Sequence, residues 1–256
     1  MRSGYSVSRG WRAVFVAVLR PSLFLLMRRE WRGRENVPRS GGVILAANHV
    51  TELDSLSMAH FVYKCDRWPA FLIKDAVFKV PVLGALLLKV GQISVARGGV
   101  DAAKSLRYAE QALEKGAAVV IFPEGTCTRD PDQWPMVAKT GVARLAMTSG
   151  KPVIPIAHYG AHQILGYRSK KLHLFPRKLV HMVAGPPVDL SAHLGEPLTA
   201  PNLTAVTAEI MADITGLLAT IRDGEPPAEP YDPRRARKEK HAGDTPGDDG
   251  TDRKSA

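Results

Sequence analysis

The sequence predicts an α/β fold with a mainly parallel sheet flanked by helices. Apolar runs of strand length alternate along the chain with longer stretches of helical periodicity, the order that builds parallel sheets. The runs at 43–45 and 119–121 are continuously apolar, as in strands that are covered on both faces. Polar residues follow several of these runs, and ligands bind at the carboxyl ends of parallel strands.

Each expected element corresponds to one stretch of sequence. The expected strands cover residues 41–49, 68–75, 92–97, 117–125, 152–160, 171–175 and 178–188, of which the last two can pair as a hairpin. The expected helices cover residues 53–64, 77–91, 101–116, 139–150 and 203–223. Pro81 interrupts the second helical stretch and Gly91 ends it, whereas Asp101 can cap the third and Gly116 can end it.

The first 34 residues read as a basic, amphipathic and helical segment. Residues 1–40 contain nine arginines and two glutamates, so +7 of the net charge of +10 lies there. The apolar stretch is interrupted at Arg20-Pro21, is too short for a span of roughly 20 residues and lacks a signal-peptide cleavage site. We expect residues 1–34 to dock on a membrane, with arginines at the lipid phosphates. A Pro-kinked helix packed on the domain is the alternative.

The remainder divides into a folded domain, residues 35–223, and a polar tail, residues 224–256. From about Gly224 the sequence is rich in Pro, Gly, Asp, Lys and Arg and has almost no large apolar side chains. We expect this tail to be disordered, because it buries too little apolar surface to offset its ordering. The two cysteines, Cys65 and Cys127, form neither a disulfide framework nor a metal-binding spacing, which fits a reducing cytosol.

His49 and Asp54 stand five residues apart, where the first expected strand runs into a helix. A histidine can act as general base near neutral pH, and an acid at one ring nitrogen fixes its tautomer and supports the imidazolium. The two side chains can meet if His49 lies in the turn and Asp54 in the first helical turn. Taken alone, the spacing also fits a helix cap and a surface acid.

Three further segments lie at expected strand ends. Lys74 and Arg97 end neighbouring strands and could face one anionic ligand. The loop FPEGTCTRD, residues 122–130, supplies a carboxylate, a flexible turn, a hydroxyl and a guanidinium. Its candidate residues are Glu124, Gly125, Thr126 and Arg129. The run VIPI, residues 153–156, indicates by itself only a strand with a proline at its edge.

Together and in this order, the four segments resemble the sequence blocks of the glycerolipid acyltransferases, most closely the 1-acylglycerol-3-phosphate (lysophosphatidate) acyltransferases. The matching blocks are Asn48-His49-x-x-x-x-Asp54, Gly91-x-x-x-x-x-Arg97, Phe122-Pro123-Glu124-Gly125-Thr126 and Val153-Ile154-Pro155-Ile156. The first and third blocks together are highly specific. The resemblance extends roughly from Gly33 to Pro187 and covers most of the folded domain. It therefore implies that residues 35–223 are an acyltransferase domain.

The resemblance implies transfer of a fatty acyl group from acyl-CoA or acyl-carrier protein to the free hydroxyl of lysophosphatidate, giving phosphatidic acid. It makes His49 the general base for the acceptor hydroxyl and Asp54 the residue that orients it, without an acyl-enzyme. The residues it implies for the acceptor's glycerol phosphate are Lys74, Arg97, Glu124, Gly125, Thr126 and Arg129. The fourth block would shape the acyl site, and no metal or organic cofactor is implied beyond the acyl donor.

The chain departs from the family pattern directly after Thr126. The family usually has arginine there, whereas this chain has Cys127, and Arg129 could substitute from two residues further on. The acceptor could therefore be another lysophospholipid, glycerol-3-phosphate or a glycolipid. A non-catalytic protein that binds anionic lipids is a second alternative. Cys127 as a nucleophile would need a base that the neighbouring sequence does not offer.

The expected partners are an anionic membrane surface, a lysophospholipid acceptor and an acyl donor. The protein is expected to be peripheral, on the cytoplasmic face of the membrane. Basic charge also suits nucleic acid, but no aromatic-basic platform or recognition motif is present, so no nucleic-acid partner is expected. The other histidines are expected to be structural or exposed, although His158 and His162 could approach the site.

Overall fold

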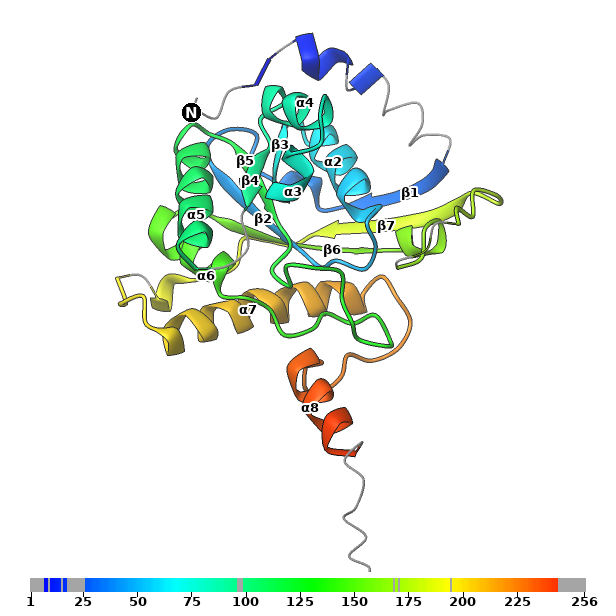
Figure 1. Ribbon diagram of the computed structural model, residues 1–256, viewed down its shortest axis with the longest axis vertical. Helices are drawn as coiled ribbons and strands as arrows, with labels where there is room; N and C mark the ends of the chain where they lie inside the picture. The colour runs from blue at the N-terminus through cyan, green and yellow to red at the C-terminus, as the bar shows by residue number, and fades with distance from the viewer. Residues whose placement is uncertain are drawn as a thin grey trace, which may run out of the picture.

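The computed structural model describes residues 7, 8, 10–14, 16, 17, 26–95, 99–167, 169, 171–193 and 195–243, with backbone alone for 99–104 and 240–243. Within these residues, seven strands form one sheet flanked by helices, which confirms the predicted α/β fold (Figure 1). No helix in this described part is both long and apolar enough to cross a bilayer.

The sheet has the order β1-β7-β6-β2-β5-β3-β4. The strands are β1 (Met27–Arg32), β2 (Val43–Ala47), β3 (Pro69–Lys74), β4 (Ile93–Val95), β5 (Ala118–Ile121), β6 (Val153–Tyr159) and β7 (Lys178–Ala184). From β6 to β4 all neighbours are parallel, whereas β7 is antiparallel to β6 and parallel to β1. The helices are α2 (Asp54–Lys64), α3 (Asp75–Phe78), α4 (Leu83–Lys89), α5 (Gly99–Glu114), α6 (Gly141–Ser149), α7 (Ala200–Ala219) and α8 (Pro233–Gly243). Short 3-10 turns are η1 (Arg34–Asn36), η2 (Ala161–Gln163) and η3 (Ser191–His193).

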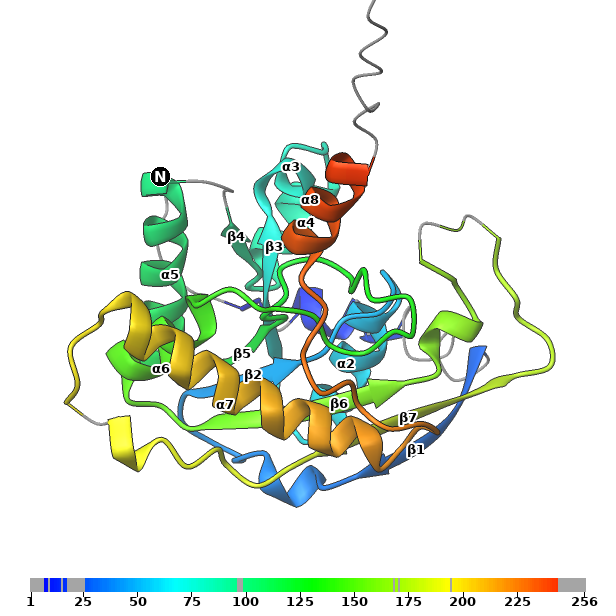
Figure 2. The same ribbon diagram turned by 90° about the horizontal axis from the view of Figure 1, so that it is seen from below.

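Helices cover both faces of the sheet, and β2 shows how. Ile44 and Ala46 belong to a core formed with α5, α6 and α7. Val43 and Leu45 point to the other face, into a core formed with α2. Figures 1 and 2 show α7 on one side of the sheet and α2 on the other. Since side chains on both faces are buried, the strand reads as continuously apolar.

The ends of β2, β5 and β3 are neighbours in the sheet, and this brings three sequence motifs together. The loop after β2 carries His49, the loop after β5 carries residues 122–130, and Lys74 ends β3. Lys74 pairs with Val95 of β4, as expected for neighbouring strands. Arg97 lies outside the described residues.

The sheet begins earlier than the expected boundary at residue 35. Residues 27–32 form β1, an edge strand with alternately buried and exposed side chains, and Met27 is fully buried. Because a half-buried edge strand exposes every second residue, its arginines resembled the polar face of an amphipathic helix. Residues 10–14, 16 and 17 are helical, whereas residues 18–25, with Arg20-Pro21, lie outside the described residues.

Two other expectations, the strand at residues 171–175 and the place of Pro155, are wrong. Residues 171–175 form no strand and contribute one isolated bridge, between Leu172 and Leu165. Leu172 and Phe175 are exposed, whereas Leu174 is partly buried against the cluster that contains Ile164, and β7 pairs with β6 and β1 instead. Pro155 lies inside β6 rather than at its edge, and β6 itself sits between β7 and β2. Its carbonyl still accepts a hydrogen bond from the Gly185 N–H (2.9 Å).

The tail expected to be disordered contains helix α8. Its first turn is capped by Asp232, whose Oδ1 accepts the Arg234 N–H at 2.8 Å, and Pro233 occupies the first helical position. Arg235 and Glu239 pair across one turn at 3.0 Å. Capping and helix-favouring residues thus order a segment that is too polar to form a core. Residues 244–256 lie outside the described residues.

Candidate active site

The structure brings His49 and Asp54 into direct contact. Nδ1 of His49 lies 3.0 Å from Oδ2 of Asp54, the first residue of α2. The same oxygen accepts the backbone N–H groups of Val50 (2.6 Å) and Thr51 (2.7 Å). Asp54 therefore closes the turn after β2 and holds one imidazole nitrogen at once, which leaves Nε2 of His49 for chemistry.

His158 stands on the other side of Asp54. Its Nδ1 lies 3.5 Å from Asp54 Oδ1, and its Nε2 lies 2.5 Å from the carbonyl oxygen of Asn48. Burial alone opposes ionisation of Asp54, yet His158, His49 and the Thr51 N–H hold the pKa of this carboxyl below its ordinary value. Burial also lowers the pKa of His158, against the attraction of Asp54. His158 is thus a buried member of the site.

The loop after β5 clamps the loop that carries His49. Oε1 of Glu124 accepts the His49 N–H at 3.0 Å, and Oε2 accepts the Met136 N–H at 3.1 Å. The Thr128 N–H donates to the His49 carbonyl at 2.6 Å. Glu124 is 2% exposed, and burial raises its pKa to about 8. Its carboxyl group therefore holds backbone N–H groups and does not line the cavity, where the resemblance placed it at the acceptor.

Phe122 and Cys127 flank the imidazole of His49. The Phe122 ring stacks on it with centroids 4.2 Å apart, and the Cys127 Sγ lies 3.6 Å from Nε2. The fold thus supplies the basic neighbour that the local sequence of Cys127 lacks. Burial, together with Glu52 and Asp54, raises the pKa of the Cys127 thiol to about 12. A thiol held in its protonated form is a weak nucleophile, so the geometry favours His49 as the reactive group.

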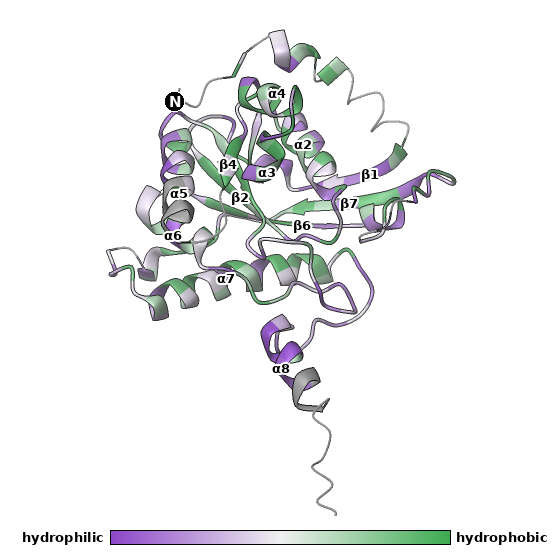
Figure 3. Ribbon diagram, viewed as in Figure 1, coloured by the Kyte–Doolittle hydropathy of each residue, from purple (hydrophilic) through white to green (hydrophobic). Residues whose placement is uncertain are grey.

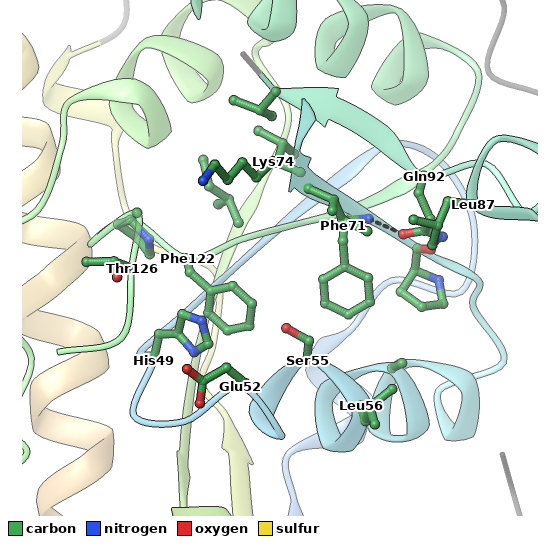
Figure 4. Close-up of a pocket in the computed structure, with 18 of the residues that line it drawn as sticks. His49, Glu52, Ser55, Leu56, Phe71, Lys74, Leu87, Gln92, Phe122 and Thr126 are labelled. Atoms are coloured by element: carbon green, nitrogen blue, oxygen red, sulfur yellow. Dashed lines mark hydrogen bonds between the residues drawn. The ribbon is translucent and has the colours of Figure 1, made fainter. Parts of the chain in front are cut away.

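A cavity of about 720 Å³ opens beside His49 and runs between α2 and β3 (Figure 4). The polar residues His49, Glu52, Ser55, Lys74 and Thr126 lie toward one side of it in Figure 4, and the polar Gln92 lies toward the other. Lys139 also lines the cavity, beside Gly125. Apolar side chains line much of the rest, among them Leu56, Ala59, Trp68, Phe71, Leu72, Leu87 and Val95. The cavity therefore joins a charged, hydrogen-bonding end to an apolar channel.

The expected acceptor-binding residues separate into two groups. Lys74, Gly125 and Thr126 line the cavity, whereas Glu124 is turned into the protein and Arg129 is exposed elsewhere. Lys139 belongs to the first group as well, but it lies outside the four motifs, so the sequence did not predict it. Gly125 has φ +72°, and a Cβ there would lie 3.0 Å from the Lys139 ammonium, so Lys139 reaches directly over this turn. Within the described chain, no three His, Cys, Asp or Glu side chains gather as a metal site requires.

A family model and several curated proteins match this chain. The family model described as Acyltransferase matches residues 28–159, which contain all four motifs and begin inside β1. A 1-acyl-sn-glycerol-3-phosphate acyltransferase from Borreliella burgdorferi is 29% identical over 131 residues, 51% of this chain and 50% of that protein. One from Pseudomonas aeruginosa is 35% identical over 135 residues, 52% of this chain and 49% of that protein. The chain spans about half the length of these curated relatives.

A solved structure has the same fold. The 1-acyl-sn-glycerophosphate (LPA) acyltransferase PlsC from Thermotoga maritima superposes with a TM-score of 0.61 at 22% identity, covering 85% of this chain and 84% of that one. The family model spans slightly more than half of the 256 residues. The chain therefore belongs to the Acyltransferase family.

Proposed function

We propose that the protein is an O-acyltransferase that moves a fatty acyl group from acyl-CoA or acyl-carrier protein to the free hydroxyl of 1-acylglycerol-3-phosphate, giving phosphatidic acid. The observation that carries this proposal is the contact of 3.0 Å between His49 and Asp54 at the polar end of an apolar cavity. The family and the names of the relatives from Borreliella and Pseudomonas support the same reaction.

His49 is the general base in this proposal. Its Nδ1–H donates to Asp54, so Nε2 can take the proton from the acceptor hydroxyl as that oxygen attacks the thioester carbonyl. The carbon–sulfur bond then breaks, and the imidazolium returns the proton to the leaving thiolate. Asp54 supports the transient imidazolium, as the acid of a hydrolase triad does. The acyl group passes directly between substrates, without an acyl-enzyme and without a metal or organic cofactor.

The two ends of the cavity suit the two ends of a lysolipid. The Lys139 ammonium lies over Gly125 and Lys74 lines the same cavity, so both can contribute to binding an acceptor phosphate. We retain Arg97 as a further phosphate ligand on the resemblance alone. The apolar channel can take an acyl chain, and each buried methylene contributes about 0.8 kcal/mol. Glu124 acts indirectly, by positioning His49.

We further propose that the protein works as a peripheral protein on the cytoplasmic face of an anionic membrane. The lysolipid acceptor resides in a bilayer, and the arginine-rich first 40 residues are suited to lipid phosphates. Both cysteines, Cys65 and Cys127, are free thiols, which suits a reducing compartment.

Product identification tests the reaction. Purified protein in detergent is incubated with lysophosphatidate and, separately, with acyl-CoA or acyl-carrier protein, and products are identified by mass spectrometry. We expect phosphatidic acid with at least one donor. Absence of any acyl transfer with either donor, from a folded protein, would overturn the proposal and favour a lipid-binding role.

Cys127 gives a specific reason to consider a second acceptor. Beside Nε2 of His49 stands a neutral thiol, where the family usually has a guanidinium. The same acyltransferase could therefore act on another lysophospholipid, glycerol-3-phosphate or a glycolipid. An acceptor panel assayed under identical conditions decides between them: the preferred acceptor is the one with the highest kcat/KM.

A further inference from the structure

Helix α8 is strongly basic and lies outside the region that the family model matches, residues 28–159. Its sequence contains five lysines and arginines and one glutamate. Arg234, Arg237 and Lys238 are three and four positions apart, so they share one side of the helix, and all three are exposed. These three residues form what we call the basic face. Within the described part of the chain, none of their side chains forms an ion pair.

The other residues of α8 leave the basic face turned to solvent. Arg235 pairs with Glu229 (3.6 Å) and Glu239 (3.0 Å), so its charge is already balanced. Ala236, on the side of the helix opposite the basic face, is only partly exposed. The sequence of α8 contains no large apolar side chain, and Figure 3 shows the helix as hydrophilic. The exposed charge of the basic face is therefore available for an electrostatic contact with a partner.

The segment that leads into α8 is fixed to the loop after β5. The Val137 N–H donates to the Tyr231 carbonyl at 3.0 Å, two residues before α8 begins. The Arg222 guanidinium lies 4.2 Å from the centre of the Trp134 ring, and its Nη1 donates to the Asp132 carbonyl at 2.8 Å. Figures 1 and 2 both show α8 next to this loop. The helix is therefore held beside the loop that borders the candidate active site.

The same loop leads from the α8 segment to the cavity. Val137, at the contact with Tyr231, is 45% exposed. Lys139, two residues further along, is exposed and also lines the cavity, so it stands at the opening. Two residues of extended chain span at most about 7 Å, so the contact with the α8 segment lies close to this opening. A partner bound on α8 would therefore lie beside the cavity that contains His49.

We propose that the basic face of α8 is the docking site for the acyl donor in its carrier-protein form. Acyl-carrier proteins are acidic, and opposite charges across an interface speed encounter and favour the correct partner. Such a donor carries its thioester at the end of a flexible phosphopantetheine arm, so a carrier protein docked beside the opening can deliver the thioester to His49. The inference rests on the proposed acyl transfer and adds which donor is used and which surface receives it.

An anionic membrane fits the basic face less well than an acidic protein does. Helices that lie in a bilayer surface combine cations with large apolar side chains, which α8 lacks. Figure 1 also shows α8 at the opposite end of the protein from residues 10–14, which belong to the segment proposed to meet the membrane. A bilayer in contact with that segment leaves α8 in the aqueous phase, where a soluble acidic protein can reach it.

Steady-state kinetics with two donors test the docking site. The full chain and a basic-face variant are assayed in detergent with palmitoyl-CoA and with palmitoyl acyl-carrier protein, on the acceptor that the panel identifies. The variant carries Arg234→Gln, Arg237→Gln and Lys238→Gln, because glutamine removes the charge and still favours a helix. We expect its kcat/KM for the carrier-protein donor to fall at least about tenfold, and that for palmitoyl-CoA to stay within about twofold. Added salt should weaken the parent's use of carrier protein much more than the variant's.

A control variant loses the same amount of charge elsewhere. It carries Arg39→Gln, Lys115→Gln and Lys171→Gln, at three exposed positions that do not line the cavity. Arg39 and Lys115 precede the parallel strands β2 and β5, so they lie at the edge of the sheet opposite the loops of the site. The control should match the parent with both donors. This result would separate a contact at α8 from a general effect of net charge.

Titration with fluorescently labelled holo acyl-carrier protein measures docking without catalysis. The parent and the control should bind it, and the basic-face variant should bind at least about tenfold more weakly. The proposal is overturned if the parent neither binds nor uses the carrier protein, if the variant matches the parent, or if the variant loses both donors equally. Weaker binding of the variant to phosphatidylglycerol vesicles, at unchanged carrier-protein kinetics, would assign the basic face to lipid and overturn it too. Carrier-protein binding that depends on the basic face, without acyl transfer from either donor, would contradict the proposed function and leave the docking site standing.

Discussion

The backbone N–H of His49 donates a hydrogen bond of 3.0 Å to Oε1 of Glu124, so the loop after β5 fixes the position of the loop after β2. Glu124 is almost completely buried at this junction. Two motifs that are 75 residues apart in sequence thereby become one rigid unit. The first motif supplies the base and its acid, and the third holds the backbone that carries the base.

Glu124 predicts a pH dependence of stability. Burial raises its pKa from 4.5 to about 8, so between these values the native state retains a proton that the unfolded state releases. The resulting stabilisation is fully present below pH 4.5 and is lost as the pH rises through about 8. Urea unfolding compares the parent with variants over this window, because the buried His158 and His162, whose pKa values burial lowers, contribute with the opposite sign in all of them. The free energy of unfolding of Glu124→Gln should rise relative to that of the parent as the pH increases from 4.5 to about 8, whereas that of the exposed control Glu225→Gln should follow the parent. An equal pH dependence in all three proteins would refute this role.

His158 predicts a shift in the pH profile of activity. It is one of the groups that lower the pKa of Asp54, so His158→Gln should raise that pKa. Because ionised Asp54 supports the imidazolium of the base His49, the variant's kcat should fall by up to about tenfold, and the fall should be largest at acid pH, where Asp54 protonates more readily than in the parent. His173→Gln, at an exposed position, is the control. A lower yield of folded protein with an unchanged pH dependence of kcat would limit His158 to a packing role.

Cys127 should resist alkylation in the folded protein. With its pKa raised to about 12, it should react with iodoacetamide at pH 8 on the order of a thousandfold more slowly than an unperturbed thiol. Cys65, whose pKa burial raises to about 11, should also be slow, and both should react readily in urea. Mass spectrometry of timed samples measures this. Cys127→Ala should retain turnover within a few-fold; rapid alkylation with loss of turnover, or an inactive Cys127→Ala, would assign the thiol a direct role.

Lys74 and Lys139 should determine acceptor affinity rather than turnover. If their ammonium groups bind the acceptor phosphate, Lys74→Ala and Lys139→Ala should each raise the KM for lysophosphatidate several-fold and leave kcat nearly unchanged. Lys171→Ala, at an exposed position outside the cavity, should change neither KM nor kcat. A fall in kcat at constant KM would show that the lysines act on the reaction itself. Unchanged kinetics in both variants would place the phosphate elsewhere.

The central strands of the sheet could be predicted from sequence because their signal lies in a few consecutive residues. β2 and β5 lie inside the sheet, so their side chains are apolar on both faces and stand out in sequence. β1 was not predicted because an edge strand is half exposed, and its arginines give it the same sequence pattern as a membrane-binding helix. Helix α8 depends on the cap at Asp232 rather than on buried apolar residues, so hydrophobic composition does not reveal it.

The site was predictable in its motifs and not in its geometry. His49 and Asp54 are neighbours in sequence, so their contact follows from a strand–turn–helix. His158 reaches Asp54 only because β6 pairs with β2, a long-range fact that no local pattern encodes. Glu124 was recognised as part of a motif, but whether it faces ligand or backbone depends on tertiary packing.

The kcat of His49→Ala measures the central claim most directly. With Nε2 removed, turnover of lysophosphatidate should fall by at least about 10³-fold, and Asp54→Asn, which weakens the support of the imidazolium, should lose about 10²–10⁴-fold. Circular dichroism and vesicle binding should match the parent in both variants. Loss of turnover in a folded His49→Ala protein is the predicted result, and turnover at the parental rate would contradict the assignment of His49 as the base.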